Sequence, residues 1–549
     1  MKANFKQIGL VTAIAAVTAG YTSVAGAQAV RSTGNLGDLG VIPYYSVQDD
    51  WATGVHIINT SSSTQVVKLR LRRASDSADA LDFNLIMSPN DEWTGSLDNS
   101  TGNTIFTTQD TTCTAPLRAD GQFPMPAIFA NGAEEGYIEV ISMGQPTSEG
   151  APIALAAKHA AGVPADCAGV ESNFFANGSA VAPISNGNVN NALTHQTSGA
   201  GAAAGYAAGG ATCLTAAGGV ITAADSTLAG FCQNNFVPSD ANALKVSYFL
   251  RDAGTGIEFG GNAVHVSGFN STGAAWMTNQ ETGLFSGDAQ GFDYPDLDGG
   301  PWIGAAPAGD SATLRGLYDG LRATNLLGSP TVLNDWSIAT ARNVSTDWVV
   351  TFPGQYTMLD YWVWVSQGFS TDTCGQVAIA ATSQPAVPLC DFRDIPVTAD
   401  LTLYDREEGV ITPASGSLVI SPAPPGVTNT LLLPNEVNVV EWTDGANTPV
   451  LGSAYATTVD ASVLGDFGWA SLAVSSKAGT QAVCDFDLVT SNSNPAGTPA
   501  WTTDARRVGT CTDVTNPDVP MVGFVAWERS FPQNPDGNYG RLIDHSFSS

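Results

Sequence analysis

Apolar and polar residues alternate with a period of two in several short segments of the first half of the chain. The clearest is VKLRLR at 67–72, where every second residue is Lys or Arg. This alternation predicts a half-buried strand, with one face toward a core and the other toward solvent. Segments 54–59 and 81–85 lie on either side of it with turn residues between them, so the three are predicted to form an antiparallel meander. The pattern continues at 137–141, 244–248 and 263–266.

A second group of strand-like segments begins near Asp335, after a turn-rich stretch around Gly299 and Gly300. Its members are 347–352, 401–404, 418–420, 436–440, 470–474 and 523–527. Many short strands, with 58 Gly and 30 Pro and only 13% charged residues, predict an all-β chain. We expect tandem antiparallel β-sandwich domains, immunoglobulin-like or jelly-roll-like, with long disulfide-pinned loops.

The two groups of segments predict a division of the chain into domains. The first sandwich is expected over 28–300, a linker over 301–334, and the second sandwich over 335–549. Between about 145 and 235 the sequence is dominated by Ala, Gly, Ser and Asn. A disordered linker would explain that composition, but three cysteines fall inside it. We therefore expect a disulfide-pinned insertion that protrudes from the first sandwich.

The N-terminal residues are typical of a signal peptide. Lys2 and Lys6 precede an apolar run at 8–17, and small residues then lead to Ala27. We expect a leader over 1–27 with cleavage before Gln28. A retained membrane anchor is the alternative, and it is disfavoured because no stop-transfer pattern follows. No later segment reaches about 18 consecutive apolar residues, so no transmembrane helix is predicted. The expected location is extracellular or at the cell surface, with the periplasm less favoured.

The chain has eight cysteines, an even number that favours disulfides in an exported protein. None of them forms a CxxC pair. Pairing of nearest neighbours is the simplest hypothesis, and other pairings stay open. The hypothesis joins Cys213 to Cys232, Cys374 to Cys390, and Cys484 to Cys511, and it leaves Cys113 with Cys167.

The formal net charge of −30 argues against nucleic acid as a partner, because such a chain repels polyanions. The excess of acidic residues suggests either a protein that stays soluble in salty water or one that uses divalent cations. The candidate calcium site is the segment GFDYPDLDGG at 291–300, where Asp293, Asp296 and Asp298 offer hard oxygen ligands on a glycine-rich loop. The segment lacks the Glu that completes an EF-hand loop. A solvated acidic turn is the alternative.

Catalytic motifs of the common hydrolases do not occur. The sequence has no G-x-S-x-G, no H-E-x-x-H and no Walker loop. Its histidines are widely scattered, at His56, His159, His195, His265 and His545. Glu407 and Glu408 suggest a glycosidase, but neighbouring residues on a strand point to opposite faces, so one of them would need another partner such as Asp405. A charged strand end is the alternative.

The densest aromatic cluster is YWVWV at 361–365. Trp362 and Trp364 would share one strand face, as stacking on sugar rings requires. Sandwich cores place aromatic residues in the same way, and a core position is the favoured interpretation.

Several segments resemble large exported proteins of Gram-negative bacteria that are usually called cell-surface proteins or left uncharacterised. The similar pieces are DWVVTFP at 347–353, DREE at 405–408 followed by Ser421-Pro422, NEVNV at 435–439, and LDFNL at 81–85. The resemblance covers most of the chain after the leader. It implies an exported location and transfers no catalytic residue.

Together these observations predict a secreted, non-enzymatic structural protein of the cell surface or extracellular matrix, with itself or surface glycans as partners. Two alternatives remain. A secreted polysaccharide hydrolase would bring acids such as Asp405 and Glu407 together in a cleft. An extracellular glycan-binding module would expose Trp362 and Trp364.

Overall fold

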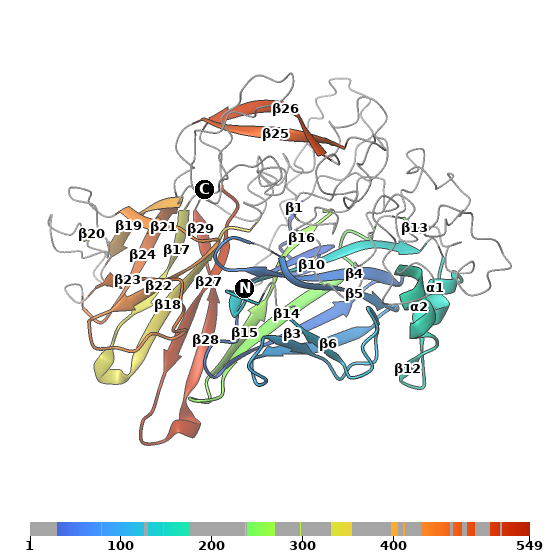
Figure 1. Ribbon diagram of the computed structural model, residues 1–549. Helices are drawn as coiled ribbons and strands as arrows, with labels where there is room; N and C mark the ends of the chain where they lie inside the picture. The colour runs from blue at the N-terminus through green and yellow to red at the C-terminus, as the bar shows by residue number, and fades with distance from the viewer. Residues whose placement is uncertain are drawn as a thin grey trace, which may run out of the picture.

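The computed structural model describes the parts of the chain that are drawn as ribbons in Figure 1. The described residues are 30–77, 79–125, 130–146, 148–174, 236–237, 239–269, 297, 331–353, 397–404, 410–411, 430–461, 465–474, 480–488, 506–515 and 519–548.

The first part of the chain forms a sandwich of two antiparallel sheets (Figure 1). In the eight-stranded sheet the order is β1 (Val30–Arg31), β16 (Val264–Ser267), β2 (Leu39–Ser46), β10 (Glu135–Pro146), β4 (Gln65–Arg73), β5 (Asp79–Met87) and β8 (Cys113–Ala115), with β13 (Phe236–Val237) paired to β10. In the six-stranded sheet the order is β15 (Glu258–Asn262), β14 (Leu244–Asp252), β3 (Trp51–Asn59), β6 (Glu92–Asp98), β7 (Ile105–Thr107) and β9 (Gln122–Pro124).

Alternating apolar residues of these two sheets meet in a common core. Phe83 of β5 packs across the sandwich against Trp93 of β6, with ring centroids 6.0 Å apart, and stacks on Phe123 of β9 at 4.1 Å. All three side chains are fully buried. The alternation at 81–85 therefore marks a core strand, as predicted.

The second part of the chain forms another sandwich. Its outer sheet has the order β20 (Val410–Ile411), β19 (Val397–Tyr404), β24 (Phe467–Val474), β17 (Thr331–Ser337) and β29 (Ser546–Ser548), with β21 (Thr430–Leu433) paired to β19. Its five-stranded sheet has the order β23 (Ala456–Asp460), β22 (Val437–Thr443), β18 (Val344–Thr351), β27 (Val522–Arg529) and β28 (Tyr539–Asp544). Only the β22–β23 pair among the described strands is parallel. The all-β sandwich architecture predicted from the sequence is confirmed.

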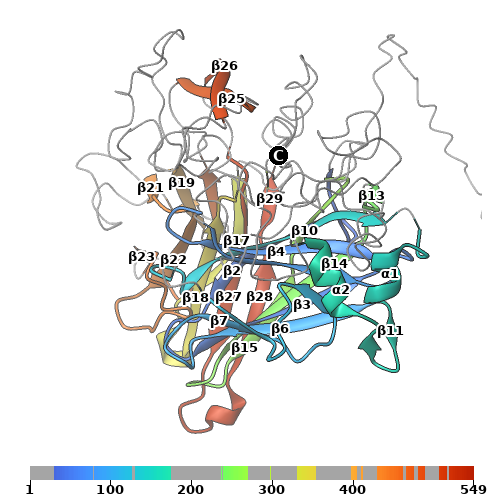
Figure 2. The same cartoon turned by 45° about the vertical axis from the view of Figure 1, so that its right-hand side comes forward.

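The central strand of the five-stranded sheet, β18, is buried on both of its faces. Trp348 and Val350 of β18 belong to the core between the two sheets of the second sandwich. Val349, between them, belongs to the core cluster of the first sandwich, as does Phe524 of β27. In Figures 1 and 2 this sheet lies between the outer sheet and the first sandwich. One continuous apolar cluster therefore includes residues of both sandwiches.

A few short elements complete the described chain. Helices α1 (Pro152–Ala157) and α2 (Cys167–Phe174) flank the hairpin of β11 (His159–Ala160) and β12 (Val163–Pro164), and β25 (Thr480–Leu488) pairs with β26 (Arg506–Thr515). Two 3-10 turns lie at Thr340–Arg342 and Pro535–Gly537. In these described parts of the chain, no helix has the length and apolar character needed to cross a membrane.

The predicted meander of 54–59, 67–72 and 81–85 is wrong in one strand. β4 and β5 pair as expected, but β3 lies in the opposite sheet between β14 and β6. The chain changes sheets after Asn59, where the N–H of Thr60 donates to the carbonyl oxygen of Ala243 (2.7 Å). Period-two alternation identifies each strand but does not say which strand it pairs with.

The prediction that 67–72 is only half-buried is also wrong. The side chains of Lys68, Arg70 and Arg72 are fully buried. Arg70 Nη2 lies 3.5 Å from Asp82 Oδ2, and Arg72 Nε lies 3.3 Å from Glu139 Oε1. These carboxylates come from the neighbouring strands β5 and β10, so opposite charges face one another across the sheet. Alternation correctly separates the two faces of β4, but it does not show whether the second face is open to water.

Candidate functional site

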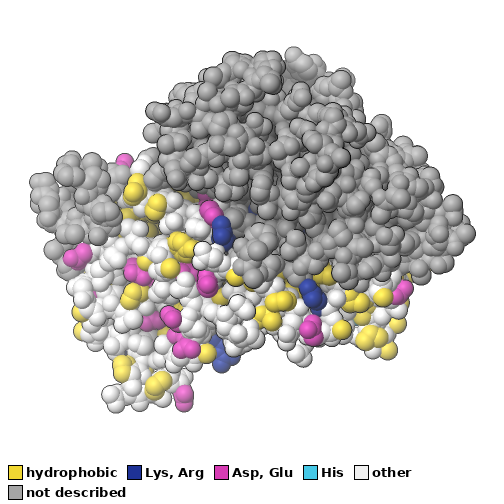
Figure 3. Space-filling model, viewed as in Figure 1, with side chains coloured by type: hydrophobic (Ala, Val, Ile, Leu, Met, Phe, Trp, Pro, Cys, Tyr) yellow, Lys and Arg dark blue, Asp and Glu magenta, His cyan; other side chains and the backbone are white. Residues whose placement is uncertain are grey.

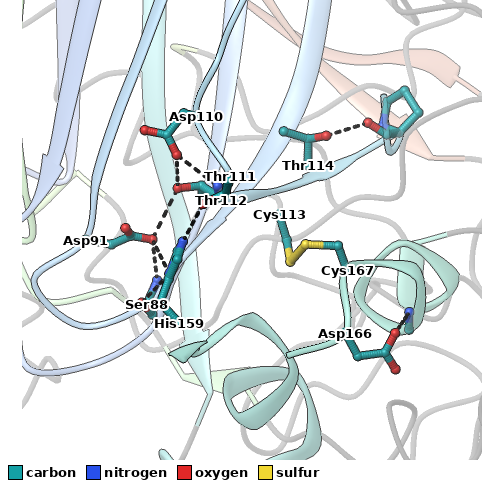
Figure 4. Close-up of a disulfide and its surroundings, with 12 residues drawn as sticks. Ser88, Asp91, Asp110, Thr111, Thr112, Cys113, Thr114, His159, Asp166 and Cys167 are labelled. Carbon is teal, nitrogen blue, oxygen red and sulfur yellow. Dashed lines mark hydrogen bonds and ion pairs between the residues drawn. A yellow bond between two sulfur atoms is a disulfide. The ribbon is translucent and has the colours of Figure 1, made fainter. Parts of the chain in front are cut away.

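A disulfide pins the start of the predicted insertion to the edge of the first sandwich (Figure 4). Cys113 lies in the edge strand β8, and Cys167 is the first residue of α2. Around the bond is a small apolar cluster separate from the main cores, in which Val66 and Ile86 of the sheet pack with Ile153 of α1 and Val170 of α2. The bridge joins residues 54 positions apart. It confirms the pairing of Cys113 with Cys167 and the disulfide-pinned character of this part of the insertion.

Beside the disulfide, an imidazole lies between a carboxylate and a hydroxyl (Figure 4). His159 Nδ1 is 3.7 Å from Asp91 Oδ2, and His159 Nε2 is 3.2 Å from Thr111 Oγ1. The three residues come from β11, from the turn before β6, and from the segment before β8. Burial raises the pKa of Asp91 above its usual range, against the opposing effect of His159. Hydrolases that use a catalytic triad arrange a carboxylate, an imidazole and a nucleophilic hydroxyl in the same sequence of contacts.

The hydrogen bonds of the same groups favour a structural role. Thr111 Oγ1 donates to the carbonyl oxygen of Gly162 (3.0 Å), so its proton points away from His159. Asp91 Oδ2 accepts the N–H of Ser88 (3.1 Å) and closes the turn that leads into β6. A nucleophile would need its proton directed at the imidazole. The array therefore ties the β11–β12 hairpin to the turn before β6 and to the segment before β8.

Two other histidines within the described residues, His265 and His545, are buried and make hydrogen bonds to the backbone, whereas the partly exposed His56 pairs with Glu92, with Nε2 2.8 Å from Oε1. His265 Nε2 accepts the N–H of Val246 (2.8 Å), and His545 Nε2 donates to the carbonyl oxygen of Val349 (2.9 Å). Burial lowers the pKa of each of these two imidazoles to about 4. Both are therefore neutral at ordinary pH, as buried structural histidines are expected to be.

A polar junction joins the two sandwiches at Glu135 of β10. Its Oε2 accepts hydrogen bonds from the hydroxyls of Tyr44 and Ser453, and its Oε1 accepts the N–H of Ala454 (2.8 Å). Tyr44 belongs to β2, whereas Ser453 and Ala454 belong to the segment between β22 and β23. Burial raises the pKa of Glu135, and the three donors act in the opposite direction. The carboxyl group thus connects the two halves of the chain.

Two further contacts extend this junction. Thr351 Oγ1 donates to the carbonyl oxygen of Pro43 (2.6 Å), and the N–H of Val437 donates to the carbonyl oxygen of Ala74 (2.9 Å). Nearby, Asp347 is fully buried and accepts the N–H of Leu451 at Oδ2 (2.8 Å). Desolvation raises the pKa of Asp347 well above its usual range. No sequence motif pointed to this junction, because its partners lie hundreds of residues apart.

Most site residues predicted from the sequence lie outside the described residues. These are the calcium candidates Asp293, Asp296 and Asp298, the aromatic pair Trp362 and Trp364, the acids Asp405, Glu407 and Glu408, the cysteines Cys213, Cys232, Cys374 and Cys390, and His195. Among residues that the structure does describe, no cluster of three or more His, Cys, Asp or Glu side chains could hold a metal ion. Cys484 and Cys511 are direct cross-strand partners in the register of β25 and β26.

Comparison of the chain with protein-family models, with curated proteins and with solved structures finds no match.

Proposed function

We propose that this chain is a secreted, non-enzymatic structural protein of the cell surface or extracellular matrix. The Cys113–Cys167 disulfide supports folding in an oxidising compartment, in agreement with the leader expected over 1–27. Beside it, the side chains of His159, Asp91 and Thr111 are engaged in contacts that join neighbouring loops. These three polar groups therefore serve to hold the fold together.

The observation that carries the proposal is the junction at Glu135. A protein with a catalytic cleft between its domains needs a solvent-filled gap there, and inter-domain interfaces that permit motion are small and polar. Here the meeting surface contains fully buried Glu135 and Thr351, and apolar residues of both sandwiches pack into one cluster. Two sandwiches held in this way form a single block, which suits a load-carrying or spacing role.

Cell fractionation with an immunoblot tests the location, and an activity screen tests the absence of catalysis. We expect the mature protein at the cell surface or in the matrix fraction, and no release of reducing ends from polysaccharides by the purified chain. A purified protein that hydrolyses a polysaccharide, and loses this activity in His159→Gln while keeping its melting temperature, would replace the proposal with the hydrolase alternative.

One observation favours glycan binding as a second candidate function. Phe249 of β14 is 42% exposed on the outer face of the six-stranded sheet, and both of its cross-strand partners are glycines, Gly54 and Gly260. A Cβ at Gly54 would lie 2.0 Å from Phe249 Cε1, so the ring lies over this glycine. An aromatic ring laid along a sheet and partly open to water is suited to stacking on a sugar.

Affinity electrophoresis in gels containing neutral polysaccharides tests this second candidate. Retardation of the wild type that is abolished in Phe249→Ala, with Leu432→Ala of the outer sheet as the matched control at 43% exposure, supports it. Equal mobility of all three proteins in every gel contradicts it.

A further inference from the structure

The outer sheet of the second sandwich has one face toward the core and one face toward solvent. It lies on the side of the molecule away from the first sandwich (Figure 1). Its inward residues, such as Leu401 of β19 and Leu472 of β24, belong to the core of the second sandwich. The residues that alternate with them on β17, β19 and β24 point outward, and all of these except Ser337 are exposed or half-buried. This outward face is therefore accessible to a ligand.

An aromatic pair and a carboxylate lie in one row across this face. Tyr404 of β19 is paired with Trp469 of β24, and Trp469 is paired on its other side with Asp335 of β17. Directly opposite residues of antiparallel strands point to the same face of a sheet. The rings of Tyr404 and Trp469 are stacked, with centroids 3.7 Å apart and planes inclined by 3°. Because Tyr404 covers one face of the indole, the exposed 36% of Trp469 lies mainly on its other face and its edges.

A row of hydroxyl groups lies beside the aromatic row. Two positions along the same strands, Thr402 of β19 is paired with Ser471 of β24, and both residues are half-buried. Residues two positions apart on a strand are ~7 Å apart, so one small ligand can contact both rows. Within the described part of the chain, no hydrogen bond engages the hydroxyls of Thr402 and Ser471 or the carboxylate of Asp335. These three polar groups are therefore available to a ligand.

We propose that the outward face of this sheet binds a neutral glycan, with Trp469 as the stacking platform. A sugar ring has an apolar face of C–H groups and a rim of hydroxyls. The free face of the indole suits the C–H groups, as aromatic rings present large apolar surfaces. The hydroxyls of Thr402 and Ser471 can both donate and accept hydrogen bonds, and the carboxylate of Asp335 accepts them, so all three suit the rim. The inference goes beyond the proposed structural role, and the site is separate from Phe249.

The charge of the face favours a neutral glycan over other partners. Its exposed carboxylates are Asp335 and Asp400, and none of the outward residues described on β17, β19 and β24 is Lys or Arg. At its border Arg342 lies over the Phe467 ring, with its guanidinium carbon 5.3 Å from the centroid. The part of the second sandwich visible in Figure 3 also carries more acidic than basic side chains.

These charges disfavour each of the other classes of partner. An acidic glycan, a nucleic acid and a second copy of the chain, with its net charge of −30, would all be repelled. An apolar protein surface would bury the hydroxyls and carboxylates of the face without hydrogen-bond partners, which is costly. A neutral glycan supplies hydroxyls for these groups and adds no negative charge.

Isothermal titration calorimetry of the mature chain tests the inference. The probes are neutral oligosaccharides of glucose, of mannose and of N-acetylglucosamine, with an oligogalacturonate as the acidic comparison. We expect at least one neutral oligosaccharide to bind, and to bind more tightly than the oligogalacturonate. Trp469→Ala should raise the Kd at least about tenfold, because it removes the stacking platform. Thr402→Val removes a hydroxyl and keeps the shape of the side chain, and it should raise the Kd about three- to tenfold.

Controls separate binding from folding and from the proposed function. Phe249→Ala changes an aromatic residue of similar exposure, 42%, on the first sandwich, and it should leave the Kd unchanged. Melting curves should show that Trp469→Ala and Thr402→Val are folded at the temperature of the titration. The inference is overturned if no neutral oligosaccharide binds, if the acidic one binds most tightly, or if both variants bind as tightly as wild type. A cell-surface protein that binds none of the probes overturns only this inference. A protein that binds them at this face and also hydrolyses them overturns only the proposed function.

Discussion

Trp336 and Trp442 lie face to face, with ring centroids 5.4 Å apart and ring planes inclined by 8°. Trp336 belongs to β17 in the outer sheet and Trp442 to β22 in the five-stranded sheet, so the stacked pair joins the two layers of the second sandwich. Trp348 of β18 packs against the same Trp442 ring at 5.1 Å. All three side chains are buried.

Loss of the central ring should strongly destabilise the protein. Trp442→Ala should lower the free energy of unfolding by about 3 to 5 kcal/mol, because it removes a large apolar side chain and leaves a cavity. Trp469, which is 36% exposed and stacks on Tyr404, is the matched control. Trp469→Ala should cost about 1 kcal/mol, mostly from the lost stacking. Denaturant unfolding measures the change in the free energy of unfolding of both variants. Equal losses of stability would contradict the assignment of Trp442 to the core.

The Cys113–Cys167 disulfide should stabilise the protein measurably. Replacement of both residues in Cys113→Ala with Cys167→Ala should cost about 2 to 5 kcal/mol, since the bridge closes a long loop in the unfolded chain. Mass mapping of unreduced peptides should find the two cysteines joined in the wild type. A peptide that contains Cys113 with a free thiol would show the assignment to be wrong.

Burial of His545 should make the free energy of unfolding fall at acid pH. The pKa of His545 is lowered to about 4 in the folded protein, against 6.5 as its ordinary value. Between these values the unfolded chain binds the extra proton, so the stability that neutral His545 contributes is present above pH 6.5 and is lost as the pH falls toward 4. The loss amounts to about 3 kcal/mol. His545→Gln keeps a donor for Val349 and should show a flatter dependence when melting curves are recorded across this window.

Buried Asp347 should have the opposite effect. Because its folded pKa is raised, its contribution to stability is greatest at acid pH and is lost as the pH rises from the ordinary value of 3.8 through the raised folded value. Asp347→Asn retains an acceptor for the Leu451 N–H and does not titrate. The variant should therefore match wild type near pH 4 and melt at a higher temperature at pH 8. Asp335→Asn, exposed in β17, serves as the control and should show no such difference.

The strands could largely be predicted from the sequence, because the period-two pattern reports burial on one side of a strand. The pairing of strands could not. β3 pairs on one side with β6 and on the other with β14, nearly two hundred residues later, where Val55 lies opposite Tyr248. The same pattern at 67–72 could not show that the cationic face of β4 is covered, since the residues that neutralise it, Asp82 and Glu139, are contributed by other strands.

The junction between the sandwiches was also beyond prediction from the sequence. Glu135 and its partner Ser453 are 318 residues apart, and neither belongs to a recognisable motif. The disulfide was easier to predict, because an even number of cysteines in a chain with a leader-like N-terminus favours disulfides over free thiols. The pairing of Cys113 with Cys167 follows from the nearest-neighbour hypothesis and is confirmed.

The five-stranded sheet has a consequence for how the chain unfolds. Val349 contributes to one apolar cluster and its neighbours Trp348 and Val350 to another, so melting of β18 removes support from both sandwiches at once. Neither half should then be a separate cooperative unit, and a fragment that ends at 269 would expose the apolar surface that Phe524 covers in the intact chain. Calorimetry of the whole protein should accordingly show a single transition, with equal calorimetric and van't Hoff enthalpies.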